Sequence, residues 1–214
     1  MELHGVKIKA MMNLHLQNKI FYIVILMLSS CATIVPQKMA NKYFNKNELI
    51  ISQIEEAYKK IYVIKPIAIE FSDNKFNYVN VEIKTDSLRY IYEFNLNENS
   101  INDSLFKFGF YTLTVMRLIL DMQKIKCTWI NTLDYYVDDK KQNLIFMSMR
   151  PVFFDMALAK RKYYTLTFYK QKQYYDTEGR LLDKKNTRLL RIINNEIFWR
   201  INDRVCYTIS NHFR

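Results

Sequence analysis

Glycine and histidine are scarce in this chain, and their scarcity disfavours several classes of enzyme. The 214 residues contain 3 of each. Neither Gly109 nor Gly179 stands in a glycine-rich loop of the kind that holds phosphates, so the sequence does not predict a P-loop or dinucleotide-binding fold. Beyond residue 30 the only histidine is His212, so a Ser-His-Asp or Cys-His group would depend on a side chain near the end of the sequence. We expect no such group.

Cysteine is equally scarce, with 3 residues, and none belongs to a CxxC or HxxxH pattern. A zinc site built from these ligands is therefore not expected, and we predict no cofactor. Cys127 and Cys206 have two interpretations. An oxidising compartment would permit a disulfide between them, and two small buried side chains are the alternative. We favour burial, because Cys206 is expected to lie under Trp199.

One uninterrupted apolar run is present, from Ile20 to Leu28. As a helix it would measure about 14 Å, too short for the ~30 Å core of a bilayer. Its length, and Lys19 just before it, fit the apolar region of a signal peptide. Leu28-Ser29-Ser30-Cys31 follows and resembles the lipobox of bacterial lipoproteins. The resemblance implies cleavage before Cys31 and attachment of a diacylglycerol to that cysteine, which would hold the protein at a membrane.

This interpretation divides the chain into three parts. We expect a signal peptide over 1–30, a lipidated N-terminus and tether over 31–46, and a single globular domain over 47–214. Residues 1–10 or 1–11 are expected to precede the true start, because Met11 and Met12 lie a normal signal length before Cys31. Ala32 resembles the sorting pattern for an outer membrane, facing the periplasm, if the cell is Gram-negative. A buried N-terminal strand is the alternative.

Two helices are predicted. Asn45-Lys46-Asn47-Glu48 is typical of a capping box, and apolar residues at helical spacing follow, which predicts an amphipathic helix over 47–62. The segment 104–125 is apolar nearly all round, which predicts a second, buried helix.

Most of the remaining sequence is typical of antiparallel β-structure. Alternation over Phe76–Lys84 places Val79, Val81 and Ile83 on one face. Strands are predicted over 67–71, 76–84, 88–96, 128–137, 144–149, 163–175, 188–193, 196–201 and 204–209. The expected fold class is therefore α+β, with two helices packed on an extended, mainly antiparallel sheet of roughly eight strands and a C-terminal half that is mostly a β-meander.

The last three predicted strands are joined by Asn194-Asn195 and Asn202-Asp203, which suit two-residue hairpin turns. Two-residue turns would place Trp199 opposite Cys206 in the core. Phe198 and Tyr207 would then lie on the opposite face, with Arg191 and Arg200.

The chain is strongly basic, with a formal net charge of +11. Basic and aromatic residues are interleaved after residue 159, and we expect one sheet face to bind an anionic glycan, a lipid headgroup or an acidic protein. A signal peptide argues against nucleic acid as the partner. The predicted binding residues are Lys160, Arg161, Lys162, Lys170, Lys172, Arg191, Arg200, Tyr163, Tyr169, Phe198 and Tyr207.

We therefore expect a lipid-anchored extracytoplasmic binding or accessory protein, and not an enzyme. One alternative is a small hydrolase of cell-envelope glycans that uses carboxylates such as Asp134, Asp138 and Asp139. Another is an immunity-type inhibitor of a toxin. If the lipobox interpretation is wrong, a basic cytosolic binder of nucleic acid becomes the alternative.

Overall fold

The computed structural model describes residues 34–98, 100–137, 140–150, 162–184, 186–193 and 195–210. The predicted signal peptide, Cys31, the basic residues Lys160 and Arg161, the pair Asp138-Asp139 and His212 lie outside the described residues. The chain divides into two compact units, 1–46 and 47–214. Of the first unit, residues 34–46 are described, and they are helical. The second unit contains all the described strands and the helical residues 47–64, 100–107 and 112–124.

Helix α2 (Ile34–Ile64) begins earlier than we predicted. The predicted start at residue 47 is wrong, because no glycine or proline interrupts the helical sequence after Pro36. Pro36 itself stands in the first turn of the helix, where the missing N–H of proline costs no hydrogen bond. The predicted apolar face is confirmed, since Ile51, Ile54 and Tyr58 are fully buried. The helix ends just before Pro66, as the conformational restriction on a residue that precedes proline requires.

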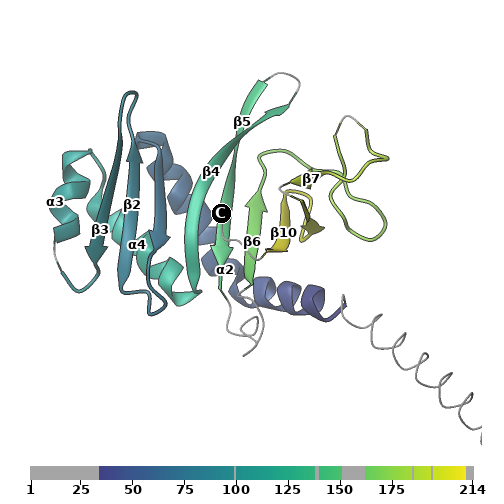
Figure 1. Ribbon diagram of the computed structural model, residues 1–214, viewed down its shortest axis with the longest axis horizontal. Helices are drawn as coiled ribbons and strands as arrows, with labels where there is room; N and C mark the ends of the chain where they lie inside the picture. Colours follow the sequence, from purple (N-terminus) through teal and green to yellow (C-terminus); the bar gives the residue numbers. More distant parts are fainter. Residues whose placement is uncertain are drawn as a thin grey trace, which may run out of the picture. The chain divides into compact units, whose positions relative to one another are not determined.

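The strands form an eight-stranded antiparallel sheet in the order β3-β2-β1-β4-β5-β6-β10-β9, which confirms the α+β fold class (Figure 1). A separate two-stranded sheet pairs β7 with β8. The bounds are β1 (Ile67–Phe71), β2 (Tyr78–Lys84), β3 (Arg89–Asn95), β4 (Cys127–Val137), β5 (Lys140–Met149), β6 (Tyr163–Phe168), β7 (Ile192–Ile193), β8 (Glu196–Ile197), β9 (Trp199–Arg200) and β10 (Val205–Ser210).

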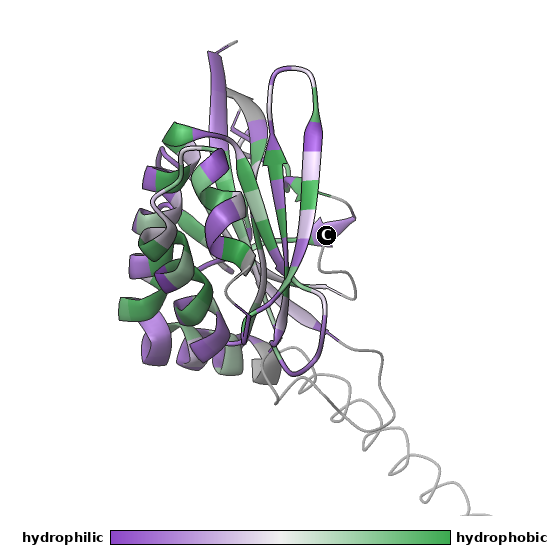
Figure 2. Ribbon diagram, turned by 90° about the vertical axis from the view of Figure 1, so that its left-hand side faces the viewer, coloured by the Kyte–Doolittle hydropathy of each residue, from purple (hydrophilic) through white to green (hydrophobic). Residues whose placement is uncertain are grey.

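One face of the sheet is covered by helices (Figure 2). On this helix face the predicted set Val79, Val81 and Ile83 is fully buried, which confirms the alternation of β2. The layers are also joined by hydrogen bonds: the Gln123 side chain in α4 donates to the Phe76 carbonyl at 2.7 Å, and the Tyr58 hydroxyl donates to the Ile67 carbonyl. Burial of these aliphatic side chains is the main source of stability of this layer.

The segment 104–125 is two helices, α3 (Ser100–Lys107) and α4 (Thr112–Lys124), and the single helix that we predicted is wrong. Gly109 separates them with a φ of +80°, a left-handed conformation that glycine adopts at little cost. The predicted burial all round is also wrong, since Phe106 and Leu113 are 79% and 87% exposed. No helix in the described part of the chain is long and apolar enough to cross a membrane.

The C-terminal hairpin differs from the predicted register by one residue. Cys206 pairs with Arg200 and Tyr207 with Trp199, so the connecting loop is Asn202 to Arg204 and has three residues. The Asn202 side-chain oxygen stabilises this longer loop by accepting hydrogen bonds from the N–H groups of Arg204 and Val205, both at 2.9 Å. A shift of one residue moves every side chain to the other face. Ile193 pairs with Glu196, in contrast, which is the pairing that the predicted two-residue turn at Asn194-Asn195 requires.

Candidate functional site

A pocket of about 340 Å³ opens between the C-terminal turns of α2 and the helix face of β4, β5 and β6. Its volume is within the usual range for small-ligand sites. Its walls are largely aromatic and aliphatic, and charged groups gather at its rim. We call it the α2 pocket. Its lining residues are Glu55, Tyr58, Lys59, Tyr62, Val63, Thr132, Asn143, Ile145, Phe168, Tyr169, Lys170 and Arg204.

Helical and strand periodicity bring these side chains together. The five residues from α2 recur at spacings of three and four, which places them on one side of the helix. On the sheet, Thr132 pairs with Ile145, and Ile145 pairs with Phe168. Residues directly opposite each other share a face, so these three form a continuous floor.

Tyr58 is a fixed wall of the pocket. It is fully buried, its hydroxyl donates to the Ile67 carbonyl, and it also hydrogen-bonds with Thr132. Burial raises the pKa of this hydroxyl well above its usual value, so it stays protonated. Its ring lies 6.0 Å from that of Tyr62 between centroids. Tyr58 therefore contributes shape and not acid–base chemistry.

The rim of the α2 pocket carries three cations and one carboxylate. The ammonium of Lys59 lies 2.6 Å from Glu55 and 3.0 Å from Glu56, so its charge is locally balanced. Neither Lys170 nor Arg204 has a carboxylate of the described residues within ion-pair distance, although Arg204 interacts electrostatically with Glu56 at longer range. The rim therefore has a positive excess that an anionic group could balance.

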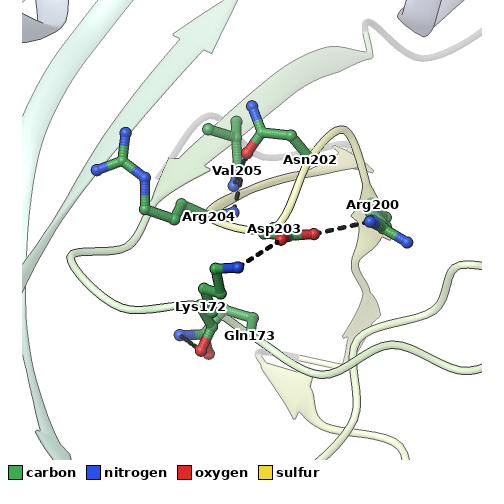
Figure 3. A network of polar contacts seen from close by, with 7 residues as sticks. All are labelled: Lys172, Gln173, Arg200, Asn202, Asp203, Arg204 and Val205. Carbon is green, nitrogen blue, oxygen red and sulfur yellow. Dashed lines mark hydrogen bonds and ion pairs between the residues drawn. The ribbon is translucent and has the colours of Figure 1, made fainter.

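Arg204 also borders a second cluster of charges (Figure 3). Asp203 bridges two cations there, with Lys172 at 3.3 Å and Arg200 at 2.7 Å. The hydrogen bond and charge of Lys172 lower the pKa of the Asp203 carboxyl, which keeps it ionised. Figure 3 shows the Arg204 side chain directed away from this carboxylate. Because Asp203 is bound by Lys172 and Arg200, the Arg204 guanidinium remains available to the α2 pocket, which Arg204 lines.

The structure brings together only part of the predicted binding face. Lys170, Lys172 and Arg200 lie around Arg204, as described above. Lys162 and Tyr163 lie at the start of β6 and line neither hollow. Arg191 lines neither pocket, although its guanidinium lies 5.7 Å from the centre of the ring of Tyr169, a lining residue of the α2 pocket.

Three of the four predicted aromatic platforms are buried, and their assignment to an exposed face is wrong, whereas Tyr163 is partly exposed. Tyr169, Phe198 and Tyr207 are 2%, 4% and 1% exposed. Tyr169 and Phe198 pack with Leu144, Leu181 and Cys206 in a cluster of the core. Tyr207 packs on Tyr164, with 5.3 Å between ring centroids. Tyr169 and Phe198 are enclosed because the segment after β6 folds over the sheet, whereas Tyr207 lies within β10, on the face that it shares with Leu166 and Trp199.

The structure does not show the carboxylates of Asp134, Asp138 and Asp139 as a facing pair of the kind that hydrolysis would need, since only Asp134 lies in the described part of the chain. Asp134 forms an ion pair with Lys141 across the β4–β5 hairpin at 2.8 Å, and its side chain is 46% exposed. This is the arrangement of a solvated surface pair. Within the described ranges, no group of three or more His, Cys, Asp or Glu side chains could hold a metal ion.

Comparisons with known proteins do not assign the chain to a family. No protein-family model matches the sequence, and we found no match among curated proteins or solved structures. Any functional argument must therefore come from the residues themselves.

Cys127 and Cys206 are free and buried, which confirms the interpretation that we favoured. Burial raises the pKa of each thiol from 9.0 to about 12. We predict that, in a Cys31→Ala chain at pH 8, neither thiol reacts with a disulfide reagent until the protein unfolds. The free energy of unfolding should fall as pH rises above about 9, because the thiols then ionise in the unfolded chain before they do so in the folded one.

Thiol titration and pH-dependent denaturation check this prediction. Reaction of either thiol in the native state within the mixing time would contradict it, as would a covalent Cys127–Cys206 link seen by mass spectrometry.

Proposed function

We propose that the protein is a lipid-anchored extracytoplasmic binding protein whose ligand is an anionic amphiphile, a molecule with an apolar chain and a carboxylate or phosphate head. The observation that carries this proposal is the α2 pocket, in which an apolar floor meets an uncompensated cationic rim.

The floor provides the affinity for the apolar part. Ile145 and Phe168 lie side by side on it, and Val63 extends from the helix at the mouth. Apolar area removed from water contributes roughly 25 cal/mol per Å². Because the floor belongs to paired strands, it is already in place before a ligand arrives, and little conformational entropy is lost on binding.

The rim provides the affinity for the anionic part. Lys59 is balanced by Glu55 and Glu56, so Lys170 and Arg204 are the cations with charge to offer. A guanidinium matches the planar, two-oxygen edge of a carboxylate or phosphate, and an ammonium adds a second positive charge. Electrostatic attraction is stronger beside apolar walls than in bulk water.

The proposal is for binding and not for chemistry. The charged groups around the pocket are three cations and one paired carboxylate. Its uncharged polar groups are the Asn143 amide and the hydroxyls of Thr132 and three tyrosines, of which the Tyr58 hydroxyl already donates to a backbone carbonyl. This set suits the holding of an anion. The lipobox resemblance at Cys31 supports a location at a membrane surface, where amphiphiles are concentrated.

We predict that dodecanoate binds the protein and that uncharged dodecanol binds at least about 10-fold more weakly. Arg204→Gln should lower the affinity for dodecanoate by a similar factor and leave dodecanol unaffected, because the variant removes only the partner of the head group. Titration calorimetry measures both ligands.

Matched controls are Lys60→Gln and Arg188→Gln, which remove the same charges from exposed positions outside the pocket. They should bind dodecanoate as the parent does. Equal affinity for dodecanoate and dodecanol, or equal losses in the control variants, would refute the head-group assignment.

We also predict that mass spectrometry of protein extracted from membranes finds an acylated Cys31 at the N-terminus. Cys31→Ala should abolish the acyl mass and release the protein from the membrane fraction. Cleavage at another residue, or an unmodified N-terminus in soluble protein, would refute the lipid anchor. Ligand binding by the α2 pocket would then be tested by the dodecanoate titration alone.

A further inference from the structure

A second hollow lies on the opposite face of the sheet, over β1 to β4, where none of the described helices covers it (Figure 2). Its volume is about 340 Å³, and all its lining residues come from strands or their ends. It shares no residue with the α2 pocket. We call it the open-face hollow. Its lining residues are Ala68, Glu70, Asn80, Glu82, Lys84, Arg89, Ile91, Trp129 and Asn131.

The strand register explains why the sheet is hollowed here. Glu70 pairs with Asn80 on one side and with Trp129 on the other, so these three side chains form a row. In the next row Glu82 pairs with Ala68 and with Ile91. The side chain of Ala68 ends at its Cβ, so it forms a low floor between the longer side chains around it.

The floor of the open-face hollow is rigid. The residues that alternate with its lining, such as Ile69, Val81 and Ile130, are fully buried on the helix face. A strand fixed on one face by core packing also fixes the directions of the side chains on its other face. A ligand would therefore meet a set of groups that is largely preorganised, which reduces the entropic cost of binding.

The charges of this hollow balance one another. Glu70 and Glu82 are matched in number by Lys84 and Arg89. The Arg89 Nε and the Lys84 Nζ lie 3.2 Å and 3.5 Å from the same oxygen, Oε1 of Glu82. These contacts orient the carboxylate of Glu82. The hollow offers hydrogen-bonding groups without an excess of charge, in contrast to the α2 pocket.

The side chains that line the open-face hollow match the chemistry of a sugar ring. Saccharide hydroxyls both donate and accept hydrogen bonds, and the lining holds carboxylates that accept, cations that donate, and the amides of Asn80 and Asn131 that can do both. The Asn131 Oδ1 already accepts one hydrogen bond, from the Thr132 N–H at 2.7 Å. The C–H face of a pyranose is apolar and flat, and the half-buried Trp129 supplies an aromatic surface of that size. From these features we propose that the open-face hollow is a binding site for an uncharged saccharide.

The test is binding of the full chain to an immobilised panel of neutral and anionic saccharides, from monosaccharides to hexasaccharides. We expect at least one neutral saccharide to bind, with an affinity that changes little with salt. Ala68→Leu should reduce that affinity by about 10-fold or more, because it fills the floor while keeping every polar group. Trp129→Ala should do the same by removing the stacking surface.

The matched control is Tyr78→Ala, which removes a half-exposed aromatic ring from β2 outside the hollow and should leave saccharide binding unchanged. Thermal unfolding and dodecanoate binding by Ala68→Leu show whether that variant is folded, independently of saccharide. Three results would overturn the proposal: no neutral saccharide binds, only anionic ones bind with steep salt dependence, or Ala68→Leu binds as the parent does.

Discussion

The packing of helices against one face of the antiparallel sheet is the constraint on which the rest of this structure depends. Burial of alternate residues, such as Val79, Val81 and Ile83 in β2, sets the direction of every side chain on those strands. The residues between them then necessarily face the other way, and Glu82 becomes part of the open-face hollow. Both candidate sites are thus consequences of the same core.

The two sites differ in charge because they lie at different places on this framework. The α2 pocket forms between the last turns of α2 and strands β4 to β6. Charged residues from the helix (Lys59), from the end of β6 (Lys170) and from the loop before β10 (Arg204) therefore meet at one rim. The open-face hollow lies within regular sheet, where Glu82 forms ion pairs with Lys84 of its own strand and with Arg89 of the neighbouring strand, so the acids and bases are equal in number. An excess of positive charge favours an anionic ligand, and balanced charge favours a neutral one.

Periodicity in the sequence predicted most of the framework, and local geometry explains what it missed. The alternation of β2 and the apolar face of α2 were correct because core burial determines them. Gly109 divides the second helix through its backbone conformation, which an apolar pattern does not encode. The aromatic residues Tyr169 and Phe198 were assigned to an exposed surface because sequence does not reveal which segments fold over a sheet face.

The position of Arg204 shows how the length of a single loop can determine which side chains line a pocket. The sequence suggested a two-residue turn at Asn202-Asp203, but the Asn202 side chain supports a loop one residue longer, and Arg204 borders the α2 pocket. The most direct measurement is a crystal structure of the protein with dodecanoate. We expect the alkyl chain to lie against Ile145 and Phe168, with the carboxylate at Arg204 or Lys170. An empty α2 pocket, or dodecanoate bound with its carboxylate away from both cations, would contradict this expectation.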